Sequence, residues 1–307
     1  MERGTAQPTF TDLSVAELGS PKAKAFFDAC GREIPFDRLA ASLPDLFAND
    51  GPKGGASNGL SDPMAEEMLK DRISFRRFVG LSFDEDTPDH SVISLFRKRL
   101  RDKGCGSALF DQSLAILREK GKVLTNGTLI DATIIEAPLG GKRADGSSCG
   151  DPLASKTVKG GRIYHGFRAH IATDRAGIIT NYIYDTASVS EHTHFDHLAA
   201  REQKAVFADS GCRSRERVER LRKRGVVAGL CHRRVRGQKE LTPEQKRMNR
   251  LIAPIRAFVE HPLGWIKARL NNRRCRYRGL SRNAFDFCLS AIACNFCRAL
   301  KLQATAR

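Results

Sequence analysis

The chain has 307 residues, 41% of them hydrophobic, which is enough for one large folded domain and a smaller one. It contains no run of 18 apolar residues, so we expect no helix that spans a membrane. Its nine cysteines lack the spacing of a disulfide framework, and its first residues lack the apolar segment of a secretory signal. These features predict a protein of the reducing cytoplasm.

The net charge of +17 is concentrated in one part of the chain. Residues 201–282 hold 24 Lys and Arg against 7 Asp and Glu, whereas the remainder holds 28 of each sign. A charge that only kept the protein in solution would be spread along the chain. The concentration therefore favours a polyanionic partner, most simply nucleic acid.

Residues 1–60 are predicted to form a poorly organised leader and linker. The stretch 49–59 is rich in Gly, Asn and Ser and offers no surface for packing, so we place a boundary at its end.

Residues 61–120 are predicted to be helical. Asp62-Pro63 and Thr87-Pro88 are both typical of helix starts, and the third helix of this region is basic. Three short helices of this kind resemble a helix-turn-helix module, in which Arg97 and Lys98 would contact DNA. The alternative is that these two side chains belong to an ordinary solvated helix face.

Residues 121–307 have the pattern of a mixed α/β fold. Strands are predicted at 128–135, 164–174, 178–184, 205–209 and 226–230, and helices at 194–201, 213–224, 242–270 and 283–302. A loop of Gly, Lys and Ser is expected at 140–161.

Three acidic residues occupy informative positions in this pattern. Asp131 lies inside a strand of apolar and β-branched residues, Asp209 ends a later strand, and Glu260 lies on the next long helix. A buried carboxylate is costly unless it is paired or binds a metal. A capped turn or a partner Arg would satisfy Asp131 alone, but three converging carboxylates suit Mg²⁺. Two such ions about 4 Å apart support in-line displacement at a phosphodiester.

The helix that carries Glu260 also carries two cations at related positions. Arg256, Glu260 and Lys267 are spaced so that they share one helical face. A surface ion pair between Arg256 and Glu260 is the alternative interpretation. A basic loop follows, which contains Arg273, Arg274, Arg276 and Arg278.

Other ionisable residues receive more ordinary interpretations. Glu191, His192, His194, Asp196 and His197 have a spacing that allows a transition metal, but surface imidazoles around a helix start are favoured. We expect Glu136 and Asp174 to be surface carboxylates.

Six short stretches, taken together, resemble a known family. They are Ser74–Gly80, Leu129–Pro138, Gly166–His170, Ala208–Gly211, Val259–His261 and Arg276–Leu280, and they occur in family order within residues 61–300. In these stretches the chain resembles a bacterial insertion-sequence transposase of the DDE type, broadly of the insertion-sequence-five group.

The resemblance implies an RNase H-like mixed β-sheet flanked by helices, preceded by a small helix-turn-helix-like region at 61–120. It implies that Asp131, Asp209 and Glu260 are the catalytic residues of domain 121–307 and the ligands of Mg²⁺ or Mn²⁺, with two ions. The family's Tyr-Arg-Glu-Lys signature places its last three members on Arg256, Glu260 and Lys267, whereas Ala253 stands at the tyrosine position.

The implied reaction is strand cleavage and strand transfer at insertion-sequence ends. The implied partners are the inverted-repeat ends and target DNA, both double-stranded, and a second copy of the chain when it is assembled on DNA. The implied location is the bacterial cytoplasm, in association with the nucleoid. Arg256, Lys267 and the four arginines of the loop would contact the DNA. A non-catalytic DNA-binding protein, such as a domesticated transposase or self-repressor, is one alternative, and an RNase H-like nuclease without strand transfer is another.

Overall fold

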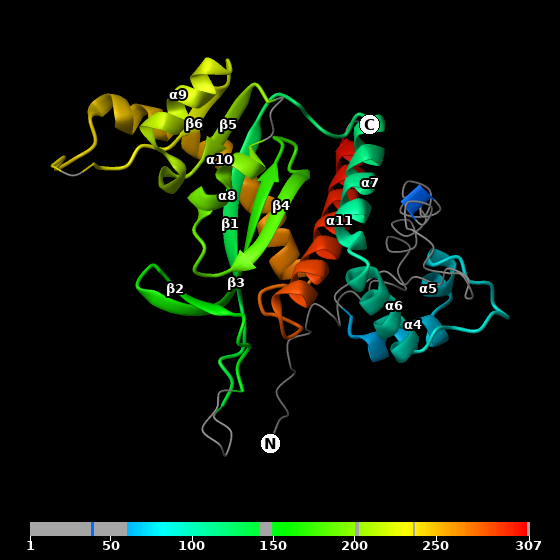
Figure 1. Cartoon of the computed structure of the whole chain (residues 1–307). Coiled ribbons are helices and arrows are strands. Elements are labelled where there is room, and N and C mark those ends of the chain that lie inside the picture. The colour runs from blue at the N-terminus through cyan, green and yellow to red at the C-terminus, as the bar shows by residue number, and fades with distance from the viewer. Residues whose placement is uncertain (1–37, 40–59, 142–148, 200–202, 236, 306–307) are drawn as a thin grey trace, which may run out of the picture. The chain divides into compact units, whose positions relative to one another are not determined.

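The computed structural model describes residues 38–39, 60–141, 149–199, 203–235 and 237–305 (Figure 1). The leader and linker expected at 1–60 therefore fall almost wholly outside the described residues. The chain divides into two compact units, residues 1–112 with 303–307 and residues 113–302. The division falls inside helix α7 (Cys105–Glu119).

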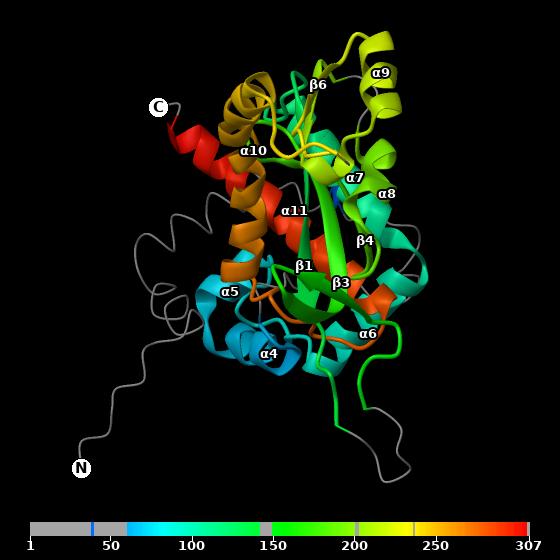
Figure 2. The same cartoon turned by 90° about the vertical axis from the view of Figure 1, so that its left-hand side faces the viewer.

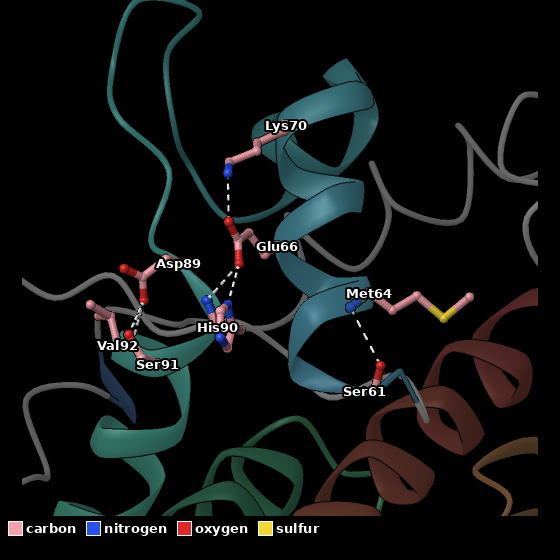
Figure 3. Close-up of polar contacts among 8 residues, drawn as sticks. All are labelled: Ser61, Met64, Glu66, Lys70, Asp89, His90, Ser91 and Val92. Carbon is pink, nitrogen blue, oxygen red and sulfur yellow. Dashed lines mark hydrogen bonds and ion pairs between the residues drawn. The ribbon is translucent and has the colours of Figure 1, made fainter.

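The described residues of the first unit include helices α4 (Asp62–Asp71), α5 (Ile73–Phe78) and α6 (His90–Asp102) and the first part of α7. Side-chain caps fix two of the starts: Ser61 accepts a hydrogen bond from the Met64 N–H, and Asp89 accepts one from the Val92 N–H (Figure 3). The third helix therefore begins after Asp89, two residues later than the sequence predicts, because the Asp side chain satisfies one of the first free N–H groups.

Glu66 joins α4 to α6 within the first unit. Its carboxylate accepts a hydrogen bond from the His90 N–H at 2.9 Å and lies 2.7 Å from His90 Nδ1 (Figure 3). It also pairs with Lys70 at 2.5 Å, and these bonds lower the pKa of Glu66 to about 2, with the Lys70 hydrogen bond as the largest cause. A small apolar core of Leu60, Met68, Leu69 and Phe75 lies beside them.

The second unit is built on a six-stranded sheet. Its strands are β1 (Thr128–Glu136), β2 (Ser155–Lys159), β3 (Arg162–Thr173), β4 (Ile179–Thr186), β5 (Ala205–Ala208) and β6 (Val227–Leu230). Strand β3 pairs antiparallel with β1, β2 and β4, while β1–β5 and β5–β6 are parallel. The order β4-β3-β1-β5-β6, with three antiparallel strands followed by two parallel ones, is that of the RNase H-like fold.

Helices cover both faces of this sheet. They are α8 (Glu191–Leu198), α9 (Arg215–Lys223), α10 (Pro243–Arg269) and α11 (Leu280–Thr305), and Figure 2 shows α8 and α9 on one side and α10 and α11 on the other. Side chains alternate along a strand, so Ile130 packs with Phe195 and Leu198 of α8 while Asp131 points to the opposite face.

Helix α11 is fixed to the sheet by both polar and apolar contacts. Asn295 of α11 exchanges two hydrogen bonds with the backbone of Ile179, at 2.7 and 2.8 Å. Phe287 packs between Tyr182 and Tyr184 of β4. A capping box at Thr242 starts α10, which continues through Pro254 and Pro262 for 27 residues.

Strand β2 was not predicted, because the expectation of a loop at 140–161 is wrong for its last third. Ser155–Lys159 pairs with β3 through a two-residue turn at Gly160 and Gly161, whose φ angles are 58° and 76°. Positive φ at both positions is what a type I′ hairpin turn requires. The strand has only one large apolar residue, Val158, so it lacks the usual hydrophobic signal.

Gly166 marks the point where β3 passes from this hairpin into the sheet, and there β3 packs very closely on β1. A Cβ atom on Gly166 would lie 2.1 Å from the Ile135 carbonyl oxygen. Gly166→Ala should therefore lower the free energy of unfolding by about 3 kcal/mol, the upper end of overpacking costs, because backbone cannot move aside as a side chain can. Thermal melting is the measurement.

Gly264→Ala is the matched control, because a Cβ at this helical position meets nothing within 4 Å. It should stabilise the fold by about 0.5–1 kcal/mol through helix propensity. Equal melting of the two variants would contradict the close approach at Gly166.

Candidate active site

Strand β1 positions Asp131 on the face of the sheet that α10 covers. The side chain is partly buried, and the Ala132 N–H donates to its Oδ1 at 2.8 Å. Among the described residues Asp131 has no ion-pair partner within 4 Å. Burial raises the pKa of the Asp131 carboxyl and the negative charge of Asp209 adds to this, against the Ala132 hydrogen bond and the charges of Arg256 and Lys159.

Asp209 reaches the same place from the neighbouring parallel strand. Leu129 of β1 pairs with Phe207 of β5, so each aspartate stands two residues beyond a paired position. Asp209 precedes a short 3₁₀ turn (Ser210–Cys212), and its side chain is 50% exposed. The parallel register therefore brings Asp131 and Asp209 to the same level along two neighbouring strands in the middle of the sheet.

Arg256 of α10 supplies the countercharge for both carboxylates. Its Nη1 lies 3.4 Å from Asp209 Oδ1. Burial works to lower the pKa of Arg256, but the carboxylates of Asp209 and Asp131 outweigh it and raise that pKa. The Nε–H of Arg256 is buried and has no acceptor among the described residues. The alternative in which Arg256 pairs with Glu260 is not what the structure contains.

Glu260 lies one turn after Arg256, and its side chain is exposed. The inward face of α10 is formed instead by its apolar residues, which are Ile252, Val259, Leu263 and Ile266. Within the described ranges no group of three or more His, Cys, Asp or Glu side chains is placed to hold a metal ion. The structure thus brings Asp131 and Asp209 together. Glu260 lies on the solvent-exposed side of α10.

Lys267 lies further along α10 and is partly buried. Burial lowers the pKa of its ammonium group, and the nearby charges of Lys159 and Arg273 add to the effect, while Glu136 and Asp131 oppose it. The charges of Arg256 and Lys267, both on α10, therefore interact with the charge of Asp131.

The basic loop is joined to β1 through its backbone. The Glu136 N–H donates to the Arg273 carbonyl at 3.1 Å, and the Cys275 N–H donates to the Glu136 carbonyl at 2.8 Å. These bonds keep the exposed side chains of Arg273 and Arg274 beside the end of β1.

The other predicted DNA contacts each bind a group of the protein itself, although Lys98 and Arg278 are exposed. Arg276 Nη1 lies 3.8 Å from Asp286 Oδ1, and Arg278 donates to the Gly150 carbonyl at 2.8 Å. In the first unit Arg97 pairs with Asp62, and Lys98 pairs with Asp102 at 2.8 Å. A count of basic residues in the sequence does not show which cations bind groups of the protein itself.

Two residues near the carboxylates were not assigned to this site from the sequence. Glu191 begins α8, and burial together with the charges of Asp131 and Asp209 raises the pKa of its carboxyl. Lys159 ends β2, and its charge acts on Asp131, Glu191 and Lys267. Glu191 could have been found from its position just after the third strand of the antiparallel set.

The histidines that follow Glu191 have ordinary partners. His194 Nε2 lies 3.0 Å from Asp185 Oδ2, and Asp196 pairs with Arg220 at 2.6 Å. Arg217 donates to the carbonyls of Cys212 at 2.6 Å and His192 at 3.0 Å, so it joins the turn after Asp209 to the start of α8. This arrangement agrees with the favoured interpretation of the cluster as helix-start residues.

Two known protein families match this chain. Residues 124–296 match the family described as Transposase DDE domain, and residues 55–99 match one described as Transposase domain (DUF772). The chain belongs to the transposase DDE domain family. It is a DDE-type transposase, and enzymes of this kind generally use divalent metals. Among its described helices none is long and apolar enough to cross a bilayer.

The transposase is also similar to solved structures. One is titled "Crystal structure of the Mos1 Strand Transfer Complex", with 10% identity, 94% of this chain and 98% of that chain covered, and a TM-score of 0.23. Another is "Crystal structure of a pre-cleavage Mos1 transpososome", with 11% identity, coverage of 97% and 92%, and a TM-score of 0.23.

The prediction that Asp174 is a surface carboxylate is wrong, because its side chain is 1% exposed. It accepts hydrogen bonds from the N–H groups of Ile178 at 2.9 Å and Leu124 at 2.8 Å, one on each oxygen. Burial raises its pKa as it does for Asp131. The two aspartates thus share burial but differ in how fully the backbone satisfies them.

This difference predicts opposite effects of replacing each aspartate by asparagine. A raised native pKa means that folding loses stability as pH rises above the ordinary carboxyl range, near 3.8. Asp131→Asn removes the cost of burying a negative charge and keeps one acceptor for the Ala132 N–H. It should therefore raise the melting temperature at pH 7 without divalent metal. The gain should shrink as the pH falls toward 4.

Asp174→Asn is the matched variant, and it should lower stability at pH 7. Its amide would turn an N–H donor toward one of the two backbone N–H groups, at a cost of about 1–3 kcal/mol. Melting curves across the pH range measure both. If Asp131→Asn destabilises the protein at neutral pH as Asp174→Asn does, the carboxylate at 131 is structural.

Proposed function

We propose that this transposase cleaves DNA at the ends of its insertion sequence and joins those ends to target DNA in a divalent-metal-dependent reaction. The observation that carries the proposal is the pair of aspartates from parallel strands, Asp131 and Asp209, with Arg256 at 3.4 Å from Asp209. A structural ion pair would need only one carboxylate. A second one beside it, at the same partly buried place, is costly unless it serves a cation or a reaction.

The two carboxylates that lie together, Asp131 and Asp209, offer the oxygen ligands that a hard divalent cation, Mg²⁺ or Mn²⁺, prefers. The donors are carboxylate oxygens, and Asp131 receives only one backbone hydrogen bond from the described residues. Asp131, Asp209 and the exposed Glu260 would hold the metal, with two ions in the full site. When bound, the metal would lower the pKa of the attacking water or 3′-hydroxyl and stabilise the leaving oxygen.

The cations of α10 and the basic loop would position the DNA. Arg256 holds Asp209 through one guanidinium nitrogen, and because its side chain is 22% exposed its remaining guanidinium N–H groups would contact a phosphate oxygen. Lys267, Arg273 and Arg274 would contact the phosphates that flank the reacting one. Arg276 and Arg278, whose guanidinium groups bind Asp286 and Gly150, would mainly hold the loop in shape.

Double-stranded DNA is the proposed partner, both as inverted-repeat ends and as target. The positive balance of residues 201–282 supports it, and α9 adds exposed cations at Arg215, Arg222 and Lys223. The helices of residues 61–120 would add further DNA contacts, and residues 121–307 would form the catalytic domain. We propose a homodimer on DNA, working in the cytoplasm at the nucleoid.

A non-catalytic DNA-binding protein would explain the basic surface equally well. It would not explain why two carboxylates stand together inside that surface, where they repel the DNA that the cations attract. An RNase H-like nuclease would share the carboxylates but would release cut ends without joining them. A strand-transfer assay separates these outcomes, because joined products contain new phosphodiester bonds.

Asp131→Asn should lower the rate of cleavage of an end-containing DNA by more than about 100-fold while DNA binding is retained. The reason is that the side chain loses its charge but keeps its shape. Gel assays with Mg²⁺ measure cleavage. A second readout is the rise in melting temperature that Mn²⁺ gives to the wild type and not to the variant.

Asp111→Asn changes an exposed aspartate and is the matched control, for which both readouts should equal those of the wild type. Cleavage by Asp131→Asn at the wild-type rate would refute the metal role of this residue.

Arg256 and Lys267 should differ in which replacements they tolerate. Arg256→Lys should lower end cleavage by roughly tenfold, because a lysine cannot bind Asp209 and a phosphate through separate planar donors. Lys267→Arg should be nearly neutral, since it acts as a point charge. Single-turnover cleavage and thermal melting should be measured together.

Arg250→Ala, an exposed position on the same helix, controls for the general loss of one positive charge. If Arg256→Lys melts early yet cleaves normally when folded, the arginine serves the fold and not the DNA.

A further inference from the structure

The hairpin formed by β2 and the first residues of β3, residues 155–165, projects from the sheet as a two-stranded ribbon (Figure 1). From Gly166 onward β3 pairs with β1 and β4, whereas the residues before it pair with β2. Near its tip the ribbon has two exposed apolar side chains, Val158 and Ile163, each 67% exposed. Other apolar side chains of the chain are as exposed, among them Val235 and Leu139 at 66%, but these two lie near the tip of one projecting ribbon.

The register divides the ribbon into two faces. Val158 pairs with Ile163, so the two apolar side chains lie next to each other on one face. Lys159 pairs with Arg162 on the other face, where the Arg162 guanidinium lies 5.0 Å from the centre of the Tyr164 ring. One face at the tip is therefore apolar and the opposite one is cationic.

The ribbon is held beside the carboxylates. Arg168 donates to Thr157 Oγ1 at 3.1 Å and to the Val189 carbonyl at 3.0 Å, and the Ser188 N–H donates to Ser155 Oγ at 2.7 Å. These bonds join the ribbon to the loop that leads into α8. The charge of Lys159 consequently acts on Asp131, Glu191 and Lys267.

We propose that this ribbon is a DNA-opening arm, in which Val158 and Ile163 pack against bases beside the cut and hold them out of the duplex stack. The inference rests on the proposed function, because it takes DNA at the carboxylates as given. Lys159, on the opposite face, contacts the backbone phosphate next to the reacting one.

The chemistry of the tip points to bases and not to phosphates alone. A phosphate backbone interacts favourably with cations, so a ribbon that only followed the backbone would need no apolar pair. Apolar side chains contribute to DNA binding by wedging between base steps or packing on base faces. A two-stranded ribbon also has the width that a major groove admits.

Opening of the duplex also matches the position of Asp131. Its carboxylate is partly buried in the central strand, so a phosphodiester must come close to the sheet to reach it. A strand whose neighbouring bases are unstacked can bend toward the sheet more readily than an intact duplex. The ribbon supplies this distortion on the side of the site that faces β2.

The test uses the full chain and a duplex that carries the terminal repeat of its own element, with 2-aminopurine placed at successive positions around the cut. Divalent metal is omitted, so unstacking is measured without cleavage. Wild-type protein should raise the 2-aminopurine fluorescence about fivefold at one or two positions, the size expected when a base loses its stacking partner. The double variant Val158→Ser with Ile163→Ser should lose this rise while anisotropy shows binding within about threefold of the wild type.

Val227→Ser is the matched control, because that valine is 63% exposed and lies in β6, away from the ribbon. It should keep the full fluorescence rise. An unchanged rise in the double variant, or no rise with wild-type protein, overturns the inference. Loss of copy–copy association in the double variant with an unchanged rise would assign the apolar pair to a protein contact instead.

A second comparison guards against misfolding of the double variant. Lys159→Gln and Lys156→Gln remove one exposed charge each from the same strand, and the charge of Lys159 is the one that acts clearly on Asp131 and Glu191. Lys159→Gln should slow single-turnover cleavage by roughly tenfold more than Lys156→Gln does. Equal rates overturn the role of Lys159. If wild-type protein unstacks the DNA but never cleaves it, the proposed catalytic function is refuted, whereas the role of the ribbon in opening DNA is supported.

Discussion

The short parallel pairing of β1 with β5 is the constraint on which the site depends. Two register pairs, Thr128 with Val206 and Leu129 with Phe207, are enough to bring Asp131 beside Asp209. Two carboxylates at one partly buried place repel each other and lose hydration, and both effects raise the pKa of Asp131. Arg256 offsets part of that cost from the facing helix. The paired carboxylates are therefore locally unfavourable for folding, and the apolar contacts of the core provide the free energy that offsets this cost.

The strands that form this core could be predicted from the sequence because their residues are apolar and β-branched in runs. Strand β2 could not, since Lys156, Thr157 and Lys159 leave it only Val158 as a large apolar residue, and its pairing depends on a Gly-Gly turn. Helix starts shifted where a side-chain cap decided them, as at Asp89. Burial of Asp174 was missed for a related reason, because its partners are backbone N–H groups that no side-chain pattern reveals.

The candidate site was only partly predictable. Spacing along one helix places Arg256 and Lys267 together, and both do act on Asp131. Spacing cannot tell that Glu260 is exposed, or that Glu191 approaches Asp131 and Asp209 from another helix, because these depend on how α8 and α10 pack. Charge counts mislead in the same way, since several arginines of the basic stretch bind carbonyls or carboxylates of the protein. Fewer phosphates can therefore be neutralised than the net charge implies.

Helix α10 is one continuous element of 27 residues that carries Arg256, Glu260 and Lys267. Each residue turns an α-helix by about 100°, so inserting or deleting a single residue between positions 256 and 267 would swing Lys267 away from the sheet. The loop before Thr242 has no such periodicity, and its length can change at small entropic cost. Length variation among natural descendants of this chain should therefore collect before α10 and be absent within it.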